Sequence, residues 1–181
     1  MTVSSAGELS PRAREILGAA LELLETEGAE GLTMRRLAER LGMRAPSLYK
    51  HFEDKAALEA ALATIGLEDS ARVFETAVEG SRDPLRALAR AYRAFALERP
   101  QLYRLMTERP LPRDRLPSGV EDRAARPLLE AAGGDLAAAR AIWAFAHGLT
   151  MLELNARFPP DANVDAAWER GLEAFASISH S

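Results

Sequence analysis

The stretch that decides the fold is residues 34–52, which read MRRLAERLGMRAPSLYKHF. Apolar residues recur at helical spacing on both sides of Gly42, so the pattern predicts two short helices joined by the turn Gly42-Met43-Arg44. Glycine suits this turn because it adopts a positive φ without strain. Ala38 allows the two helices to cross closely. Together these features predict a helix-turn-helix.

The two sides of this pair of helices differ in character. The apolar residues expected in the core are Leu37, Leu41, Met43, Leu48 and Phe52. The exposed side of the second helix carries short or polar residues, which suits an element that approaches the edges of DNA bases. These residues are Ala45, Pro46, Ser47, Lys50 and His51. An ordinary helical hairpin is the alternative interpretation of the same pattern.

Positive charge is concentrated on the same segment. The chain of 181 residues has a formal net charge of −4, yet residues 33–52 hold five basic residues against Glu39 alone. A DNA backbone responds to such a local patch, because salt screens charges beyond about 8–10 Å. On charge alone, chance clustering on a solvated helix face is the alternative.

Helix signals extend outward from this segment in both directions. Ser10-Pro11 starts a first helix that ends near Gly28 and Gly31, and Thr33 caps the second helix. The third helix is expected to run from about Ala45 to His51. Later helix starts are predicted at Asp54, Asp83, Pro100, Ser118, Asp135 and either Asp161 or Asn163. The eighth helix is expected to end at Pro159-Pro160.

No strand-like alternation occurs, so the sequence predicts an all-α fold of about nine helices. We expect an N-terminal DNA-binding head with the helix-turn-helix at residues 1–54. We expect a ligand-binding and dimerisation body at residues 55–181.

Composition excludes several classes of protein. The chain has no cysteine, which excludes disulfides, Cys-ligated zinc and thiol catalysis. His51, His147 and His180 have no metal-ligand spacing, so neither a metal nor a cofactor is expected. The N-terminus does not read as a signal peptide and no apolar run is long enough to span a membrane, so a cytoplasmic location is expected. No catalytic constellation or phosphate loop is present, and a His147–Glu153 site is the one enzymatic alternative.

Residues 32–58, LTMRRLAERLGMRAPSLYKHFEDKAAL, resemble the DNA-binding segment of the TetR family of repressors. The residues that carry the resemblance are Thr33, Gly42, the run Leu48-Tyr49-Lys50-His51-Phe52, and Lys55. The resemblance implies a transcriptional regulator that binds a two-fold symmetric operator in double-stranded DNA as a homodimer. It also implies release from that operator by a small-molecule effector. An activator, or a DNA-binding protein of this fold that needs no ligand, are the alternatives.

The resemblance also assigns roles to individual residues. Contacts to the phosphate backbone are expected from Thr33, Ser47, Tyr49 and Lys55. Contacts to bases are expected from Arg35, Arg44, Ala45, Pro46, Lys50 and His51. A guanine bound by Arg44 or by Arg35 is the strongest contact expected.

The predicted eighth helix has two apolar faces. One holds Ile142, Phe145, Leu149 and Leu152, and the other holds Trp143, His147, Thr150, Met151, Leu154 and Phe158. One apolar face can pack on its own chain, so the other must be covered by a second protein chain. We therefore expect helices eight and nine to pair with their copies in a homodimer, with Gly171 allowing close approach. A helix at the centre of a monomer is the alternative.

Trp143-x3-His147-Gly148 followed by Leu152-Glu153 resembles a TetR-like subgroup with a Trp…His-Gly signature. A pocket for an apolar or aromatic effector is expected to be lined by Phe74, Phe95, Tyr103, Met106, Trp143, His147 and Met151. Ordinary core packing is the alternative for each of these side chains.

Overall fold

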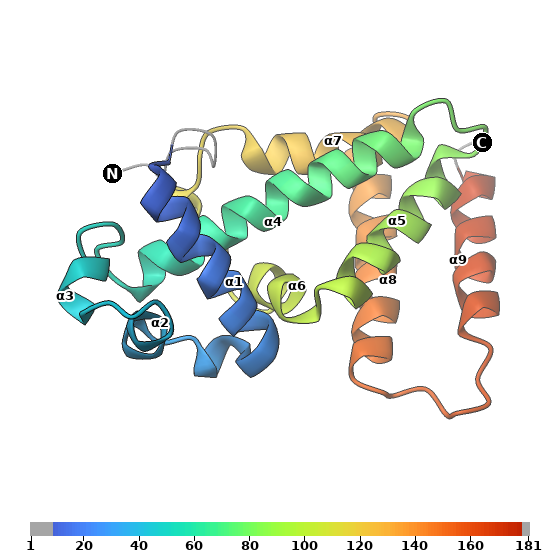
Figure 1. Cartoon of the computed structure of the whole chain (residues 1–181). Helices are drawn as coiled ribbons and strands as arrows, with labels where there is room; N and C mark the ends of the chain where they lie inside the picture. The colour runs from blue at the N-terminus through green and yellow to red at the C-terminus, as the bar shows by residue number, and fades with distance from the viewer. Residues whose placement is uncertain (1–8, 179–181) are drawn as a thin grey trace. The chain divides into compact units, whose positions relative to one another are not determined.

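The computed structural model describes residues 9–178, so His180 lies outside the described residues. Over residues 9–178 the chain forms nine α-helices and a short 3-10 helix, without a strand (Figure 1). The predicted all-α fold is confirmed. The helices are α1 (Pro11–Gly31), α2 (Met34–Arg40), α3 (Ala45–Leu48), α4 (Lys55–Val78), α5 (Pro84–Glu98), α6 (Pro100–Thr107), η2 (Arg113–Arg115), α7 (Val120–Ala131), α8 (Leu136–Leu154) and α9 (Val164–Ile178). Across the described chain, no helix combines the length and apolar composition that crossing a bilayer requires.

The chain divides into two compact units. The described part of the first unit covers residues 9–69 and 99–121, and thus holds α1, α2, α3, α6 and the first part of α4. The described part of the second unit covers residues 70–98 and 122–178. It holds α5, α8, α9, the rest of α4 and nearly all of α7. The functional division at residue 54 stays a prediction.

The core of the first unit is built on the apolar stripe of α1. Ile16 and Leu24 are fully buried in one cluster with Leu37 of α2 and Leu58 of α4. Helix α6 contributes Leu102 to the same cluster, although it lies far away in sequence. Burying one such side chain stabilises a fold by about 1.5–3 kcal/mol. Helix α6 is therefore an integral part of the core that supports the helix-turn-helix.

The start of α4 depends on Asp54, as predicted. Its Oδ1 accepts a hydrogen bond from the backbone N–H of Ala57 at 2.6 Å, and Arg115 donates to the same oxygen at 3.0 Å. The bond from Ala57, followed by the bond from Arg115, lowers the pKa of Asp54 below its ordinary value of 3.8. The native fold therefore favours the charged carboxylate.

We predict that Asp54→Asn lowers the free energy of unfolding at neutral pH, and that the difference from wild type disappears in acid. Because the pKa of Asp54 is lower in the folded state, the charged form stabilises the fold above pH 3.8. That stabilisation is lost as the pH falls through the lower, folded value. Urea unfolding of both proteins at pH 7 and at a series of pH values below 3.8 measures this. A difference that stays constant over this range would contradict the assignment.

In the second unit α8 packs against both α5 and α9 (Figure 1). Trp168 and Leu172 of α9 are buried in one cluster with Ala89 of α5 and Ala146 of α8. The ring of Phe145 stands edge-on to Trp168, with ring centroids 5.7 Å apart. The apolar stripe predicted on helix nine is therefore used inside the chain.

A partly buried carboxylate ties the same three helices together. Glu153 of α8 accepts hydrogen bonds from the indole Nε1 of Trp168 at 2.8 Å and from Nε of Arg93 at 2.9 Å. Arg93 also pairs with Asp165 at 2.6 Å. Both oxygens of Glu153 thus have structural partners.

Several predicted details differ in the structure. Helix α3 ends at Leu48 rather than near His51, and the His51 N–H closes a turn by donating to the Leu48 carbonyl, three residues earlier, at 2.8 Å. Helix α8 ends at Leu154, before Pro159, because Ala156 adopts a φ of +49°. Of the two alternatives for α9, Asn163 makes the cap: its Oδ1 accepts from the Ala166 N–H at 3.0 Å.

Thr150 of α8 is fully buried. Gly171 differs from expectation. Gly171 does allow a close approach, but the group that comes close is the Phe145 ring of the same chain.

Candidate DNA interface

The helix-turn-helix forms as the sequence predicts. Gly42 has a φ of +62°, and its N–H donates to the Glu39 carbonyl at 3.1 Å. The next N–H, of Met43, donates to the Ala38 carbonyl at 2.8 Å. Leu37 and Leu48 are fully buried on either side of the turn. A tight turn and a shared core therefore fix α3 against α2.

The predicted contact residues fall into two groups by exposure. The exposed ones are Arg35, Arg44, Pro46, Tyr49, Lys50 and His51. The half-buried ones are Thr33, Ala45, Ser47 and Lys55. Thr33 is the N-cap of α2, where its Oγ1 accepts from the Arg36 N–H at 3.2 Å. All ten lie within one continuous stretch of 23 residues, from Thr33 to Lys55.

Not every positive charge of this stretch is available to a ligand. Arg36 pairs with Glu27 of α1, and Arg40 pairs with Glu22 of α1 at 2.8 Å. Arg35 pairs with Glu39, one turn along its own helix, at 3.5 Å.

Arg44 and Lys50 differ from these three arginines in their surroundings. In the described part of the chain, Arg44 and Lys50 form no ion pair, and both are exposed. Arg44 is the N-cap residue of α3, where its side chain makes no capping bond. Arg44 and Lys50 therefore supply the uncompensated positive charge beside α3.

Lys55 is held by the first unit itself. Its Nζ donates to the Ala29 carbonyl at 2.9 Å and lies 3.5 Å from a carboxylate oxygen of Glu59. An ammonium group has three donors. Contact with a phosphate would thus use a donor beyond these two interactions, or replace one of them.

The residues predicted to line an effector pocket do not form one group. Phe74 and Phe95 lie together in the second unit, with ring centroids 6.3 Å apart. Trp143 and His147 are neighbours on α8, but the Trp143 side chain is 48% exposed. The others are Tyr103, which is buried in the first unit, Met106, which is half-buried there, and Met151, which is half-buried on α8. The pocket stays a prediction.

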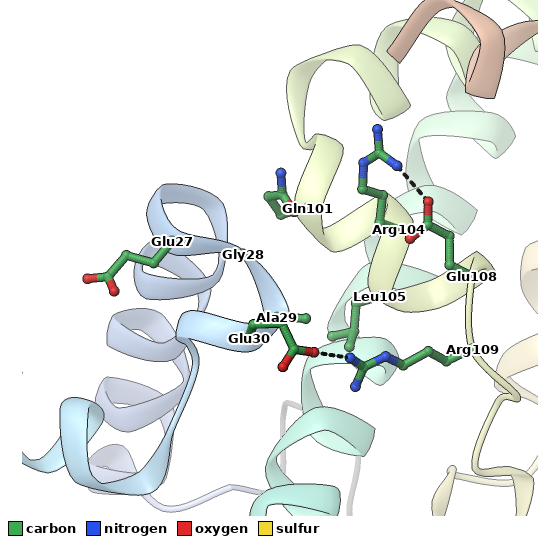
Figure 2. A pocket seen from close by; sticks show the side chains of 9 residues that line it. All are labelled: Glu27, Gly28, Ala29, Glu30, Gln101, Arg104, Leu105, Glu108 and Arg109. Atoms are coloured by element: carbon green, nitrogen blue, oxygen red, sulfur yellow. Dashed lines mark hydrogen bonds and ion pairs between the residues drawn. The ribbon is translucent and has the colours of Figure 1, made fainter. Parts of the chain in front are cut away.

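A cleft that the sequence did not predict lies in the first unit, between the end of α1 and α6 (Figure 2). It holds about 300 Å³. Its lining residues are Glu27, Gly28, Ala29, Glu30, Gln101, Arg104, Leu105, Glu108 and Arg109. Figure 2 shows the pairs Glu30–Arg109 and Arg104–Glu108 on its walls. Its two walls are about 70 residues apart in sequence, so no local pattern could reveal it.

Two protein-family profiles match the chain. Residues 16–62 match the profile described as bacterial regulatory proteins, tetR family. Residues 85–175 match that of the tetracyclin repressor-like, C-terminal domain. The chain belongs to the TetR family. The resemblance found in the sequence is confirmed, whereas the Trp…His-Gly subgroup stays a prediction.

TetR-family relatives match over different lengths. The HTH-type transcriptional regulator Rv0681 of Mycobacterium tuberculosis is 31% identical over 149 residues, which are 77% of this chain and 68% of the relative. The tetracycline repressor protein class C of Escherichia coli is 60% identical, but over 48 residues, which are 26% of this chain and 22% of that repressor. The chain thus spans less than a quarter of the class C repressor.

The solved TetR-like structures cover more of the chain. The regulatory protein SCO4313 superposes with a TM-score of 0.75 and 27% sequence identity, over 91% of this chain and 94% of the other. The identity of 60% to the class C repressor is limited to 48 residues, while the likeness in fold to SCO4313 extends over 91% of this chain. These matches agree with the prediction of a regulator and not an enzyme.

Proposed function

We propose that this TetR-family protein is a sequence-specific transcriptional regulator that binds double-stranded operator DNA. The observation that carries the proposal is the exposed face of α3 behind the Gly42 turn. There Arg44 and Lys50 are free of ion pairs within the described chain, in a protein whose net charge is negative. A helix of this kind reads base edges in the major groove. Because its partner is genomic DNA, we expect the protein in the cytoplasm.

Within this proposal the contact residues divide into two roles. Thr33, Ser47, Tyr49 and Lys55 hold phosphates, which positions the protein without reading sequence. The bases are read by Arg44, Lys50 and His51, with apolar contacts from Ala45 and Pro46. Of the two arginines considered for guanine, we favour Arg44, because Arg35 is paired with Glu39. A bidentate arginine–guanine contact is the commonest specific one in the major groove.

We further propose a homodimer formed through α8 and α9. On α8, Leu136 is 53% and Trp143 48% exposed in the single chain, and they share one face at helical spacing. Within the chain, α8 buries Ala139, Ile142 and Ala146 and packs against α5 and α9. Burying the exposed face against a second copy removes it from water and gives two-fold symmetry. Two recognition helices about 34–36 Å apart then fit successive major grooves.

Selection of DNA from a random library with the purified full-length protein tests this function. Enrichment of a two-fold symmetric site, whose half-sites are about one helical turn or a multiple of it apart, is the expected result. Failure to enrich any sequence at moderate salt would refute sequence-specific binding. Enrichment of a single half-site only would refute the proposed dimer.

An effector site in the body completes the proposed function: a small apolar molecule releases the repressor from its operator. One observation in the second unit supports it. Thr150 Oγ1 is buried and has no hydrogen-bond partner within the described residues. Other helical threonines, Thr26, Thr64 and Thr107, each donate to the carbonyl four residues earlier. Thr150 differs from these three threonines in leaving its hydroxyl unpaired, and the proposed effector would supply the missing partner. A 100-fold loss of operator affinity requires a difference of about 2.7 kcal/mol between the two states.

We predict that Thr150→Val raises the free energy of unfolding of the unliganded protein by about 1–2 kcal/mol, because a buried hydroxyl without a partner is costly. Valine has nearly the same shape and a similar helix propensity. Urea unfolding measures the change, and Thr64→Val is the control. Thr64 has its partner in the Ala60 carbonyl, at 2.9 Å, so its loss should give no gain. A destabilised Thr150→Val would show that the hydroxyl has a partner in the folded protein.

A further inference from the structure

The N-terminus of α6 lacks a cap of its own. Pro100, the first helical residue, has no N–H, and the first backbone bond of the helix runs from the Tyr103 N–H to the Arg99 carbonyl at 2.9 Å. The N–H groups of Gln101 and Leu102 are thus left without a partner inside the helix. Arg99, at the N-cap position, makes no side-chain capping bond.

Both of these N–H groups are capped by one carboxylate from α1. The Leu102 N–H donates to Glu25 Oε1 at 2.9 Å, and the Gln101 N–H donates to Glu25 Oε2 at 3.2 Å. Glu25 is half-buried and lies more than 70 residues earlier in the chain. A carboxylate is well suited to this place, because hydrogen bonds to a charged acceptor are strong and helix N-termini favour negative charge.

Further contacts hold α6 to the same unit. Arg109, just after α6, pairs with Glu30 at the end of α1 at 2.8 Å. Arg99, just before α6, pairs with Asp69 of α4 at 2.8 Å. Figure 2 shows the α6 residues facing the last turn of α1 across the cleft. Helix α6 is thus fixed at both ends, and Glu25 makes the bonds on which its first turn depends.

We propose that Glu25 is a positioning residue that couples the helix-turn-helix to α6. Helix α6 follows α5 of the second unit after the single residue Arg99, so it is the first element of the first unit that the chain reaches on returning from the second unit. Through Glu25, a shift of α6 displaces α1, on whose core α2 and α3 rest. By reciprocity, DNA that orders the head also orders the first turn of α6. This inference rests on the proposed DNA-binding function.

Hydrogen exchange of the full-length protein, with and without the selected operator, tests the coupling. In the wild type, operator binding should slow exchange of the Gln101 and Leu102 amides. In Glu25→Ala, these amides should exchange about 10-fold faster in the free protein, as expected for the loss of an N-cap, and should no longer respond to the operator. Glu25→Gln, which keeps an acceptor oxygen but loses the charge, should lie between the two and gives the readout if the alanine variant does not fold.

Glu22→Ala is the matched control. Glu22 lies on the same helix and pairs with Arg40 at 2.8 Å, away from α6. Its variant should leave exchange in α6 unchanged. If Glu22→Ala acts like Glu25→Ala, or if Glu25→Ala still shows the response to the operator, the inference is overturned. A failure to find any operator would instead refute the proposed function, while exchange in the free protein would still report on the Glu25 cap.

Discussion

Arg44→Ala is expected to cause the largest loss of operator affinity of any single change in the head. One arginine–base contact contributes about 1–3 kcal/mol, and a two-fold symmetric complex contains it twice. The dimer should therefore bind roughly 30-fold to 10⁴-fold more weakly. Arg44 is exposed and makes no ion pair within the described chain, so its removal should leave the fold of the head intact. Titration of the selected site at constant salt measures the loss.

Two comparisons separate base reading from charge. Arg126→Ala removes an exposed arginine from α7, outside the proposed dimer helices, and should leave operator affinity unchanged. Tyr49→Phe removes a proposed phosphate contact, so it should weaken binding to all sequences alike. Arg44→Ala should instead relax specificity at one base pair of each half-site. If Arg44→Ala weakens all sequences equally, Arg44 contacts phosphate and another residue reads the guanine.

Gly171→Ala is expected to have the largest effect on the stability of the second unit. A Cβ added at Gly171 would have three carbons of the Phe145 ring within 2.8 Å. The ring cannot easily move aside, because it packs between Trp168 and Phe175, with centroids 5.7 and 5.6 Å away. Overpacking of this kind costs about 1–3 kcal/mol. This cost should exceed the gain of about 1 kcal/mol that alanine brings to a helix.

Gly18→Ala is the control for this substitution. Gly18 lies within α1, and nothing stands within 4 Å of an added Cβ. Its variant should therefore gain stability from helix propensity alone. Thermal unfolding followed by circular dichroism compares the two proteins, and size-exclusion chromatography with light scattering reports the oligomeric state. A stabilised Gly171→Ala would show that the Phe145 ring can repack, and that close contact of α8 and α9 is not required.

The helix-turn-helix could be predicted because its signals are local. Gly42, the apolar spacing around it and the run from Leu48 to Phe52 lie within 20 residues, and the structure confirms the positive φ and the buried leucines. Caps are equally local: Ser10, Thr33, Asp54 and Asp135 each accept from backbone N–H groups of the helix that follows. The predicted end of α3 near His51 was wrong, because four residues of helix followed by a turn differ little in sequence from seven residues of helix.

The features that could not be predicted from the sequence depend on pairs of residues far apart in the chain. The basic count of residues 33–52 suggested five available cations, but α1 carboxylates pair with Arg36 and Arg40. The cap of α6 comes from Glu25, and the weak signal for it was an N-terminus with Pro100 but no capping residue before it. For the effector site, only the structure could show that the Thr150 hydroxyl is buried without a partner.

The sequence by itself determined the all-α fold and the helix-turn-helix of this protein, because hydrophobic period, turn chemistry and caps act over a few residues. The resemblance to the TetR family lay likewise within one short segment, residues 32–58. Tertiary structure alone decided which charges of the helix-turn-helix are already paired, that α6 belongs to the core of the first unit, and that the Gly171 face of α9 is occupied by Phe145 of the same chain. The physical reason is that burial and ion pairing depend on which helix faces meet. Two apolar faces on one helix look alike in sequence, and packing chooses which of them is covered within the chain.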